Sequence, residues 1–192
     1  MQLKIEQLSS SEYTEVSPAL EGIIINAFAG FPWFETLSEE EARSRLNAQQ
    51  IRPGSQIILA RNNEGLIVAT EWLDTPNLDQ LEKERGTPLR QFAEDIMDPL
   101  GITNLIWERE LLVDSTYQRQ GIGTLLRSFV MQSLDELPGR ALVLTRMRDD
   151  NLGTIKIAEK LGFKRTGITK PSSQTPNFNH EYWYRIGGNN YA

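Results

Sequence analysis

A glycine-containing loop is the segment of this 192-residue sequence whose residue types and spacing point most directly to chemistry. It runs from Asp114 to Gly123, after an apolar strand-like run and before a helical pattern. A helix N-terminus presents unpaired N–H groups and a partial positive charge, and both attract phosphate. Gly121 and Gly123 let the backbone approach an anion, and Arg119 adds a full positive charge. The loop therefore indicates phosphate binding, or else a tight turn whose glycines only satisfy backbone angles.

Two common nucleotide-binding motifs are absent from this loop. A dinucleotide-binding loop needs a third glycine near Leu126 and an acidic residue for the ribose, and a P-loop needs Gly-Lys-Ser/Thr. Neither pattern is present, so the sequence points to a different phosphate-bearing ligand.

Two carboxylates precede the loop on the same predicted strand. Strict alternation places Glu108 and Glu110 on one face of that strand and Arg109 on the other, unless a bulge interrupts it. A positioned carboxylate can act as a general base, so both are candidate catalytic residues, with Glu108 ahead. The alternative is a pair of solvated strand acids, balanced by Arg146 or Arg148.

The elements that must position these residues follow from hydrophobic periodicity and from turn and cap signals. We expect strands over 3–8, 56–61, 66–72, 104–113, 141–144, 163–169 and 181–186, with helical segments over 9–29, 38–52, 74–101, 124–137 and 149–161. This order predicts an α/β fold with a mixed sheet and a helical insertion between the third and fourth strands. No linker is visible, so we expect a single domain over residues 1–192.

Local signals refine the first helices. Ser9 with Glu12, and Ser38 with Glu41, have the spacing of a capping box. Pro18 lies inside the first helical segment, so the helix either kinks there or begins anew with Ser17 as its N-cap. In the helix after the glycine loop, we expect one buried stripe: Leu125, Leu126, Phe129, Val130 and Leu134.

Two segments resemble a known family. The run Gln118–Gly123 looks like the Gln/Arg-x-x-Gly-x-Gly/Ala motif of the GNAT superfamily of N-acetyltransferases, and it follows a strand as that family requires. About thirty residues on, Asn151–Phe163 resembles the family's second motif, an asparagine, a helix and Leu-Gly-Phe. The resemblance is specific over 104–166. It implies a GNAT-like acyl-CoA N-acyltransferase fold and an enzyme that transfers acetyl from acetyl-CoA to an amine.

The resemblance also implies a set of cofactor-binding residues. The backbones of Leu111 and Val113 would pair with the pantetheine arm, and a backbone N–H near Leu112 would polarise the thioester carbonyl. Asn151 would reach the pantetheine, although it can equally be a plain helix N-cap. Gln118 is part of the cofactor-binding motif, and the residues that would wrap the pyrophosphate with backbone N–H groups are Arg119, Gln120, Gly121, Ile122, Gly123 and Thr124.

One position departs from the family pattern. Where many members carry a tyrosine general acid, this sequence has Ala158. A thiolate with a pKa of about 8.5 leaves tolerably without a proton, so turnover remains feasible. Tyr117, Tyr182 and Tyr184 are candidate substitute acids, with a packing or surface role as the alternative for each. The departure also keeps open a non-catalytic or weakly catalytic acyl-CoA-binding sensor module.

The acceptor is expected to be a small-molecule primary amine, with a protein or peptide amine as the alternative; a longer or different acyl donor also remains open. Phe31–Phe34 could line an acceptor site but fits ordinary core better. The lone His180 could be a base or a structural residue. The insertion over 74–101 is acidic, which suits a lid that favours a cationic amine, or simply a solvated helical face.

Composition narrows the remaining classes. The absence of cysteine and the single histidine exclude a disulfide framework and a thiolate metal site, and argue against a multi-histidine site, so no metal is expected. A net charge of −6 argues against nucleic acid and anionic membranes. No secretory signal and no apolar run of about 20 residues is visible, so we expect a cytoplasmic protein. Exposed strand edges leave a homodimer as a family-level expectation.

Overall fold

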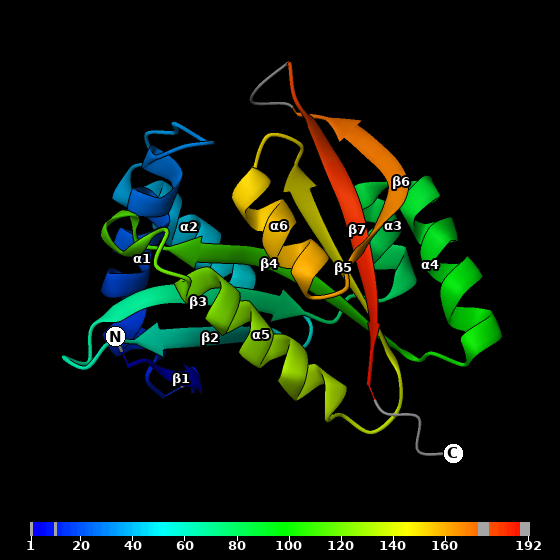
Figure 1. The fold of residues 1–192 in the computed structure, drawn as a ribbon, viewed down its shortest axis with the longest axis horizontal. Coiled ribbons are helices and arrows are strands. Elements are labelled where there is room, and N and C mark those ends of the chain that lie inside the picture. Colours follow the sequence, from blue (N-terminus) through cyan, green and yellow to red (C-terminus); the bar gives the residue numbers. More distant parts are fainter. Residues whose placement is uncertain (1, 10, 173–176, 189–192) are drawn as a thin grey trace. The chain divides into compact units, whose positions relative to one another are not determined.

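The computed structural model describes residues 2–9, 11–172 and 177–188, which form helices and a seven-stranded mixed sheet (Figure 1). The strand order in the sheet is β1-β2-β3-β4-β5-β7-β6. The chain divides into two compact units, Met1–Asp74 with Arg109–Val130 and Thr75–Glu108 with Met131–Ala192. β4 and α5 are therefore each divided between the two units. A single domain over 1–192 stays a prediction.

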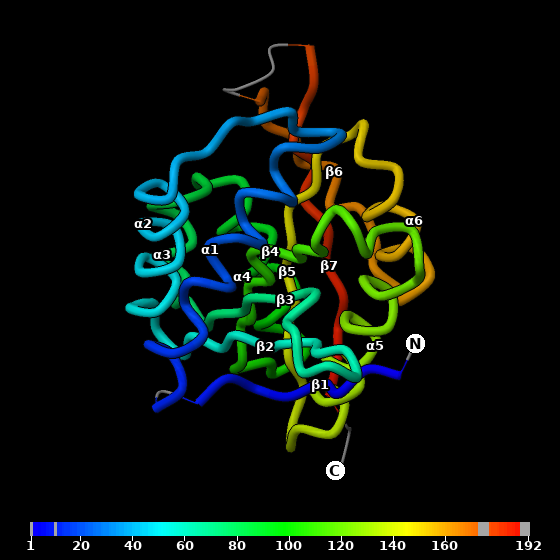
Figure 2. Tube along the Cα trace, turned by 90° about the vertical axis from the view of Figure 1, so that its left-hand side faces the viewer, coloured from blue at the N-terminus to red at the C-terminus, as the bar shows by residue number. Residues whose placement is uncertain are grey.

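The first unit holds the N-terminal strands and helices. Its elements are β1 (Lys4–Gln7), α1 (Tyr13–Ala29), α2 (Glu39–Gln50), β2 (Gln56–Arg61), β3 (Ile67–Asp74), the second half of β4 (Asn104–Val113), the short 3-10 helix η1 (Ser115–Tyr117) and most of α5 (Ile122–Asp135). β1 pairs antiparallel with β2, and β2 with β3. In Figure 2, α1 and α2 run beside β2 and β3, and the shared core includes Leu20, Leu46 and Trp72.

The second unit holds the insertion and the C-terminal strands. Its elements are α3 (Leu78–Arg85), α4 (Thr87–Leu100), the first half of β4, the end of α5, β5 (Ala141–Arg148), α6 (Leu152–Lys160), β6 (Lys164–Pro171) and β7 (Asn179–Gly187). β4 and β5 pair in parallel from Asn104 to Glu108, and β7 pairs antiparallel with β5 and β6. α3 and α4 share a core with these strands that includes Leu89, Trp107 and Leu144.

The α/β class, the mixed sheet and the order of elements predicted from the sequence are confirmed. The insertion forms two helices that meet at Gly86, whose φ of 100° and ψ of 162° suit only glycine. Pro88 then lies in the first turn of α4, where its missing N–H breaks no helical bond. Within the described ranges, no helix has the length and apolar character needed to cross a membrane.

The start of α1 differs from the prediction. The helix begins at Tyr13, and Ser9 with Glu12 closes a turn ahead of it, where the Ser9 N–H donates to the Glu12 carboxylate at 3.3 Å. Pro18 starts no new helix, because α1 runs through it. Pro18 lacks the N–H that would reach the Thr14 carbonyl, and the Ser17 hydroxyl donates to that carbonyl instead at 3.2 Å.

The capping box at Ser38 is confirmed. The Ser38 hydroxyl accepts from the Glu41 N–H at 3.2 Å, and the Ser38 N–H donates back to the Glu41 carboxylate at 2.8 Å. The Ser38 N–H and, at 2.9 Å, the Ser38 hydroxyl both donate to the Glu41 carboxylate, and these two bonds lower its pKa. The first turn of α2 is therefore fixed by local sequence alone.

The buried stripe predicted for α5 was partly wrong. Leu125 and Phe129 are 51% and 41% exposed, whereas Leu126 is fully buried. Arg127 is also buried, with its Nε 3.9 Å from the carboxylate of buried Glu71 on β3. The buried face of α5 therefore includes Arg127 and excludes Leu125 and Phe129. A pattern of apolar residues alone could not indicate a buried arginine.

Candidate active site

The loop predicted to bind phosphate joins β4 to α5 within the first unit, and Asp114 fixes its start. The Asp114 N–H donates to the Val68 carbonyl on β3 at 3.0 Å. Its Oδ1 accepts from the Thr116 N–H at 2.9 Å and the Thr116 hydroxyl at 2.6 Å, and its Oδ2 accepts from Asn26 Nδ2 on α1 at 3.0 Å. Burial raises the pKa of Asp114, but these hydrogen bonds outweigh burial and lower it. A charged carboxylate thus holds the loop between α1 and β3.

Sequence reasoning missed the two residues that hold Asp114. Val68 acts through its backbone, so its side-chain type gives no signal. Asn26 was visible only as the polar residue that interrupts the apolar run 22–31. An amide inside an apolar helix face is a sign that something polar must be bound there.

Two residues of the loop have a left-handed backbone conformation. Arg119 has a φ of 59° and Gly121 a φ of 82°, both in the left-handed region. Such conformations form concave groups of N–H donors that bind anions. The first bond of α5 runs from the Leu125 N–H to the Gly121 carbonyl at 3.0 Å. The helix N–H groups before it have no backbone partner within the described residues: Ile122, Gly123 and Thr124.

Position 121 favours glycine because of its positive φ angle, and not because neighbouring atoms leave no room for a side chain. A Cβ built there would meet no atom within 4 Å, so the space beside it is open. Gly121 and the Arg119 side chain are both exposed. Free donors, a partial positive helix end and a nearby guanidinium are what a pyrophosphate needs, so these residues fit that group.

Gln118 and Gln120 make contacts within the loop. Gln118 Nε2 donates to the Val113 carbonyl at 3.1 Å, and Gln120 Nε2 donates to the Thr116 carbonyl at 3.3 Å. The Val113 carbonyl is one of the groups that the resemblance assigns to pantetheine. Gln118 therefore ties the loop back to β4, and its contact with a cofactor stays a prediction.

The side-chain alternation of β4 is interrupted in the first unit. Arg109 forms an ion pair with Asp74. Asp74 is two positions after the core residue Trp72 on β3, so the two side chains are expected on the same face of the strand. Leu112 belongs to that same core. Strict alternation would put Arg109 and Leu112 on opposite faces, so these two contacts do not follow it. Alternation therefore does not tell whether Glu110 lies on the same face of β4 as Glu108.

Glu108 lies in the second unit and is 1% exposed. It pairs with Thr145 across the parallel β4–β5 ladder, whereas the preceding Trp107 packs in the core beneath α3 and α4. A solvated strand acid is therefore the wrong description of Glu108. Arg148, a partner considered for these acids, donates twice to Asp150, at 2.6 and 3.0 Å. Glu110, in the first unit, is half-buried.

Asn151 is the N-cap of α6. Its Oδ1 accepts from the Thr154 N–H at 3.3 Å, so the cap alternative is observed. The Nδ2 group remains available as a donor, which is compatible with the contact to pantetheine that the resemblance implies. Asn151 can serve both purposes, because one amide has separate donor and acceptor atoms.

The position of the usual tyrosine acid on α6 is Ala158, which has no hydroxyl. Its side chain is fully buried. In the first unit, the Tyr117 hydroxyl lies 3.4 Å from Asn62 Nδ2. In the second unit, Tyr184 packs edge-on against Phe92 at 5.1 Å between ring centroids. These contacts describe packing and surface roles for Tyr117 and Tyr184.

The aromatic run after α1 is divided between core and surface. Trp33 packs on Phe28 with ring centroids 5.5 Å apart, as expected for core. Phe31 and Phe34 are 64% and 72% exposed and form an edge-on pair at 6.1 Å. Ordinary core therefore describes Trp33 and not the two phenylalanines.

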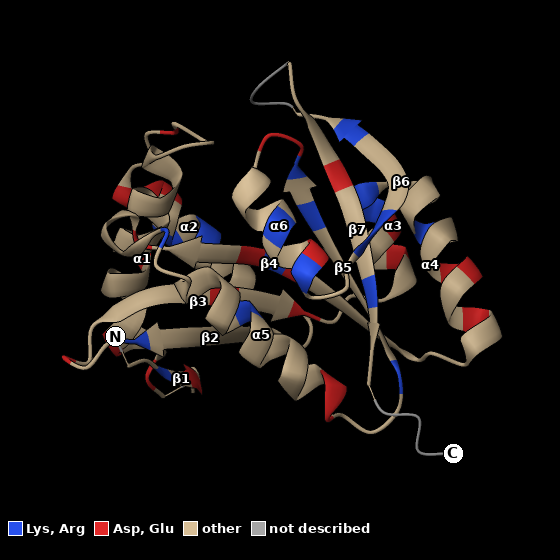
Figure 3. Ribbon diagram, viewed as in Figure 1, with Lys and Arg blue, Asp and Glu red and all other residues tan. Residues whose placement is uncertain are grey.

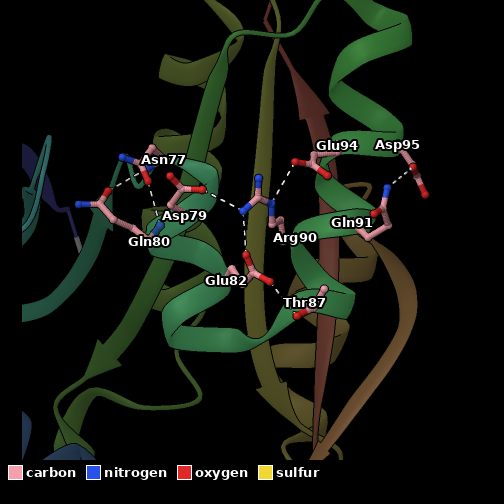
Figure 4. A network of polar contacts seen from close by, with 9 residues as sticks. All are labelled: Asn77, Asp79, Gln80, Glu82, Thr87, Arg90, Gln91, Glu94 and Asp95. Carbon is pink, nitrogen blue, oxygen red and sulfur yellow. Dashed lines mark hydrogen bonds and ion pairs between the residues drawn. The ribbon is translucent and has the colours of Figure 1, made fainter.

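Two acids of the insertion, Asp79 and Glu82 on α3, join its two helices through Arg90 on α4. Charged residues line α3 and α4 (Figure 3), and Arg90 lies at their centre (Figure 4). Its guanidinium contacts Asp79 at 2.8 Å, Glu82 at 2.7 Å and Glu94 at 3.0 Å. The Thr87 hydroxyl and Arg90 together lower the pKa of Glu82. Selection of a cationic amine by these acids stays a prediction, and Arg90 already balances part of their charge.

Comparison with known proteins decides the family. The sequence model described as the Acetyltransferase (GNAT) family matches residues 27–163, a span that contains the β4–α5 loop and Asn151. The chain belongs to the GNAT acetyltransferase family. Among curated proteins, no relative of this GNAT chain was found.

Solved structures give the same fold for this GNAT protein. A phosphinothricin acetyltransferase from Sinorhizobium meliloti, in complex with acetyl-CoA, matches with a TM-score of 0.61 at 14% identity over 98% of this chain and 90% of that one. The ribosomal-protein-S18-alanine N-acetyltransferase from Escherichia coli matches at 0.63 and 16%, over 98% and 96%. A mosquito arylalkylamine N-acetyltransferase like 5b matches at 0.62 and 15%, over 96% and 100%. At these identities the likeness concerns the fold alone.

Proposed function

We propose that this GNAT protein transfers an acetyl group from acetyl-CoA to the primary amine of a small molecule. The β4–α5 loop carries the proposal, because its left-handed residues Arg119 and Gly121 and the free N–H groups of α5 fit a pyrophosphate. The solved relative with bound acetyl-CoA supports the choice of this ligand. A cytoplasmic location is part of the proposal, since a reducing compartment suits a chain without cysteine.

The proposed reaction is direct attack on the thioester. The amine nitrogen forms a bond to the acetyl carbonyl carbon, the carbon–sulfur bond breaks, and the thiolate leaves with that electron pair. An amine with a pKa of about 10 is mostly protonated at neutral pH, so a base must take its proton. We assign this role to Glu108 before Glu110, because the buried carboxylate of Glu108 competes with less water. The Leu112 N–H is the proposed donor to the carbonyl oxygen.

The test is CoA release measured with a thiol-reactive dye across small amines and peptides. The protein has no cysteine, so it contributes no thiol background. Turnover with small amines supports the proposal, and turnover with peptides alone would replace it by protein acetylation. Glu108→Gln should lower kcat/KM by about 10²- to 10⁴-fold while acetyl-CoA still binds, and Glu110→Gln is its matched comparison. A larger loss in Glu110→Gln would exchange the two roles.

A second function, an acyl-CoA-binding sensor, is favoured by one observation. The position of the usual tyrosine acid is the fully buried Ala158. A sensor would bind acetyl-CoA tightly and release no CoA with any acceptor. Calorimetric titration of acetyl-CoA beside the dye assay separates the two functions.

A further inference from the structure

Two buried polar groups on one face of β7 have no hydrogen-bond partner within the described residues. They are Nδ1 of His180 and the hydroxyl of Tyr182, in side chains that are 6% and 2% exposed. The two residues are separated by one position, so they share a face of the strand. Leaving such a group unsatisfied in the interior costs about 1–3 kcal/mol, so each one calls for a partner.

The neighbours of these groups are cationic. Arg146 on β5 is directly opposite Tyr182, and it is exposed and forms no ion pair with any described residue. The guanidinium of Arg85 stacks 4.7 Å above the Trp107 ring, which meets the Tyr182 ring edge-on at 6.1 Å. Burial, together with Arg146, Arg148 and Arg85, lowers the pKa of His180 to about 4, and Asp149 opposes this shift. At neutral pH the imidazole is therefore uncharged in a positive surrounding.

The acids near this face leave Arg146 available. Asp150 is bonded to Arg148, and Glu84 lies 3.8 Å from Arg85. Asp149 Oδ2 accepts from the Asn179 N–H at 3.0 Å, and its buried Oδ1 has no hydrogen-bond partner within the described residues. The cluster of Arg146, His180 and Tyr182 therefore combines one uncommitted cation with two buried, unbonded polar groups.

We propose that Arg146, His180 and Tyr182 bind the carboxylate of the acceptor, so that the acceptor is a free amino acid rather than a simple amine. This inference rests on the proposed acetyl transfer. A guanidinium offers two parallel N–H donors that match a carboxylate, and the Tyr182 hydroxyl and the neutral imidazole add further hydrogen bonds. The amino-terminal residue of a peptide has no free carboxylate at this place, so peptides are disfavoured.

The first experiment compares amino acids with the amines that lack only their carboxylate. We expect kcat/KM for the preferred amino acid to exceed that of its amine by at least about tenfold. Arg146→Gln should lower kcat/KM for the amino acid about 10- to 100-fold, through KM, and leave the amine unchanged. Lys156→Gln, which removes an exposed charge on α6, is the matched control and should change neither. An equal loss with both acceptors in Arg146→Gln, or a wild type that prefers the amine, would overturn the inference.

The second experiment uses Tyr182→Phe, which removes only the hydroxyl. Because that hydroxyl has no partner within the described chain, the variant should be as stable as the wild type or more so. KM for the amino acid should nevertheless rise about 5- to 10-fold. A loss of stability with an unchanged KM would mean that Tyr182 is structural.

Calorimetry separates failure of this inference from failure of the proposed function. The amino acid and its matching amine are titrated into the CoA-bound protein, which requires no turnover. Amino-acid binding without any CoA release in the dye assay would reject acetyl transfer and retain the carboxylate site. Turnover of amines without amino-acid binding would reject the carboxylate site alone.

Discussion

Arg109 donates to both oxygens of the Asp74 carboxylate, Nε to Oδ1 at 2.8 Å and Nη2 to Oδ2 at 2.7 Å. The two side chains are 8% and 1% exposed, so this bidentate pair is shielded from water. It joins the end of β3 to the residue of β4 that lies between Glu108 and Glu110. The strand that carries both candidate bases is thus anchored by a buried ion pair.

Removal of Arg109 should strongly destabilise the protein. Arg109→Met leaves the buried Asp74 carboxylate with Arg52, at 3.7 Å, as a more distant cation. Breaking such a pair costs about 3–5 kcal/mol, which urea unfolding would measure. Arg165→Met is the control, because Arg165 is 55% exposed in its pair with Glu181 and its loss should cost less than about 1 kcal/mol. Equal losses in the two variants would contradict the distinction.

Two glycines with open space around them should respond in opposite ways to alanine. Gly121→Ala forces an alanine into a φ of 82°, which costs about 1–2 kcal/mol and should weaken acetyl-CoA binding at least about tenfold. Gly22→Ala, inside α1, should stabilise the protein by about 0.5–1 kcal/mol and leave binding unchanged. Thermal unfolding and calorimetric titration check both. Normal acetyl-CoA affinity in Gly121→Ala would argue against the loop as the phosphate site.

The contacts of Arg90 predict a salt-sensitive link between α3 and α4. Arg90→Met leaves Asp79, Glu82 and Glu94 without their shared cation, so the urea midpoint should fall. Because these groups are partly exposed, salt screens them, and the difference from the wild type should shrink between about 0.05 and 1 M NaCl. Asp98→Asn, at an exposed position of α4, is a control with little expected effect. A difference that does not depend on salt would indicate lost packing instead.

His180 predicts a pH dependence of stability in a defined window. Its pKa is lowered from 6.5 to about 4 in the folded protein, so between these values the unfolded chain binds a proton that the folded one does not. Stability should therefore be fully present above pH 6.5 and fall as the pH decreases through this window. His180→Gln should show a shallower decline in urea unfolding between about pH 7.5 and 4.5. Since His180 is the only histidine, parallel declines would contradict its assignment.

Local patterns predicted the elements well because their causes are local. The strand over 104–113 has the bounds of β4, and the capping box at Ser38 starts α2, since each depends on residues within a few positions. The sequence motifs also located the glycine loop, whose left-handed residues the structure contains.

Contacts across long sequence distances could not be predicted in the same way. Asn26 and Asp114, or Asp74 and Arg109, meet only after the strands have paired. The contacts of Arg109 and Leu112 depart from a period-two rule, and no glycine or proline between them marks the departure. The face of Glu110 is therefore undetermined by sequence, although the residue itself is easily found.

The hydrogen bond from Gln118 to the Val113 carbonyl has a consequence for solubility. A strand end with an open carbonyl invites pairing with the strand of another molecule, which is how sheets begin to aggregate. Gln118 occupies that acceptor from within the same chain. Gln118→Ala should therefore make the ligand-free protein more prone to self-association at high concentration, and light scattering would detect it. A residue of a ligand-binding motif would then also act as a guard against aggregation while the protein waits for its ligand.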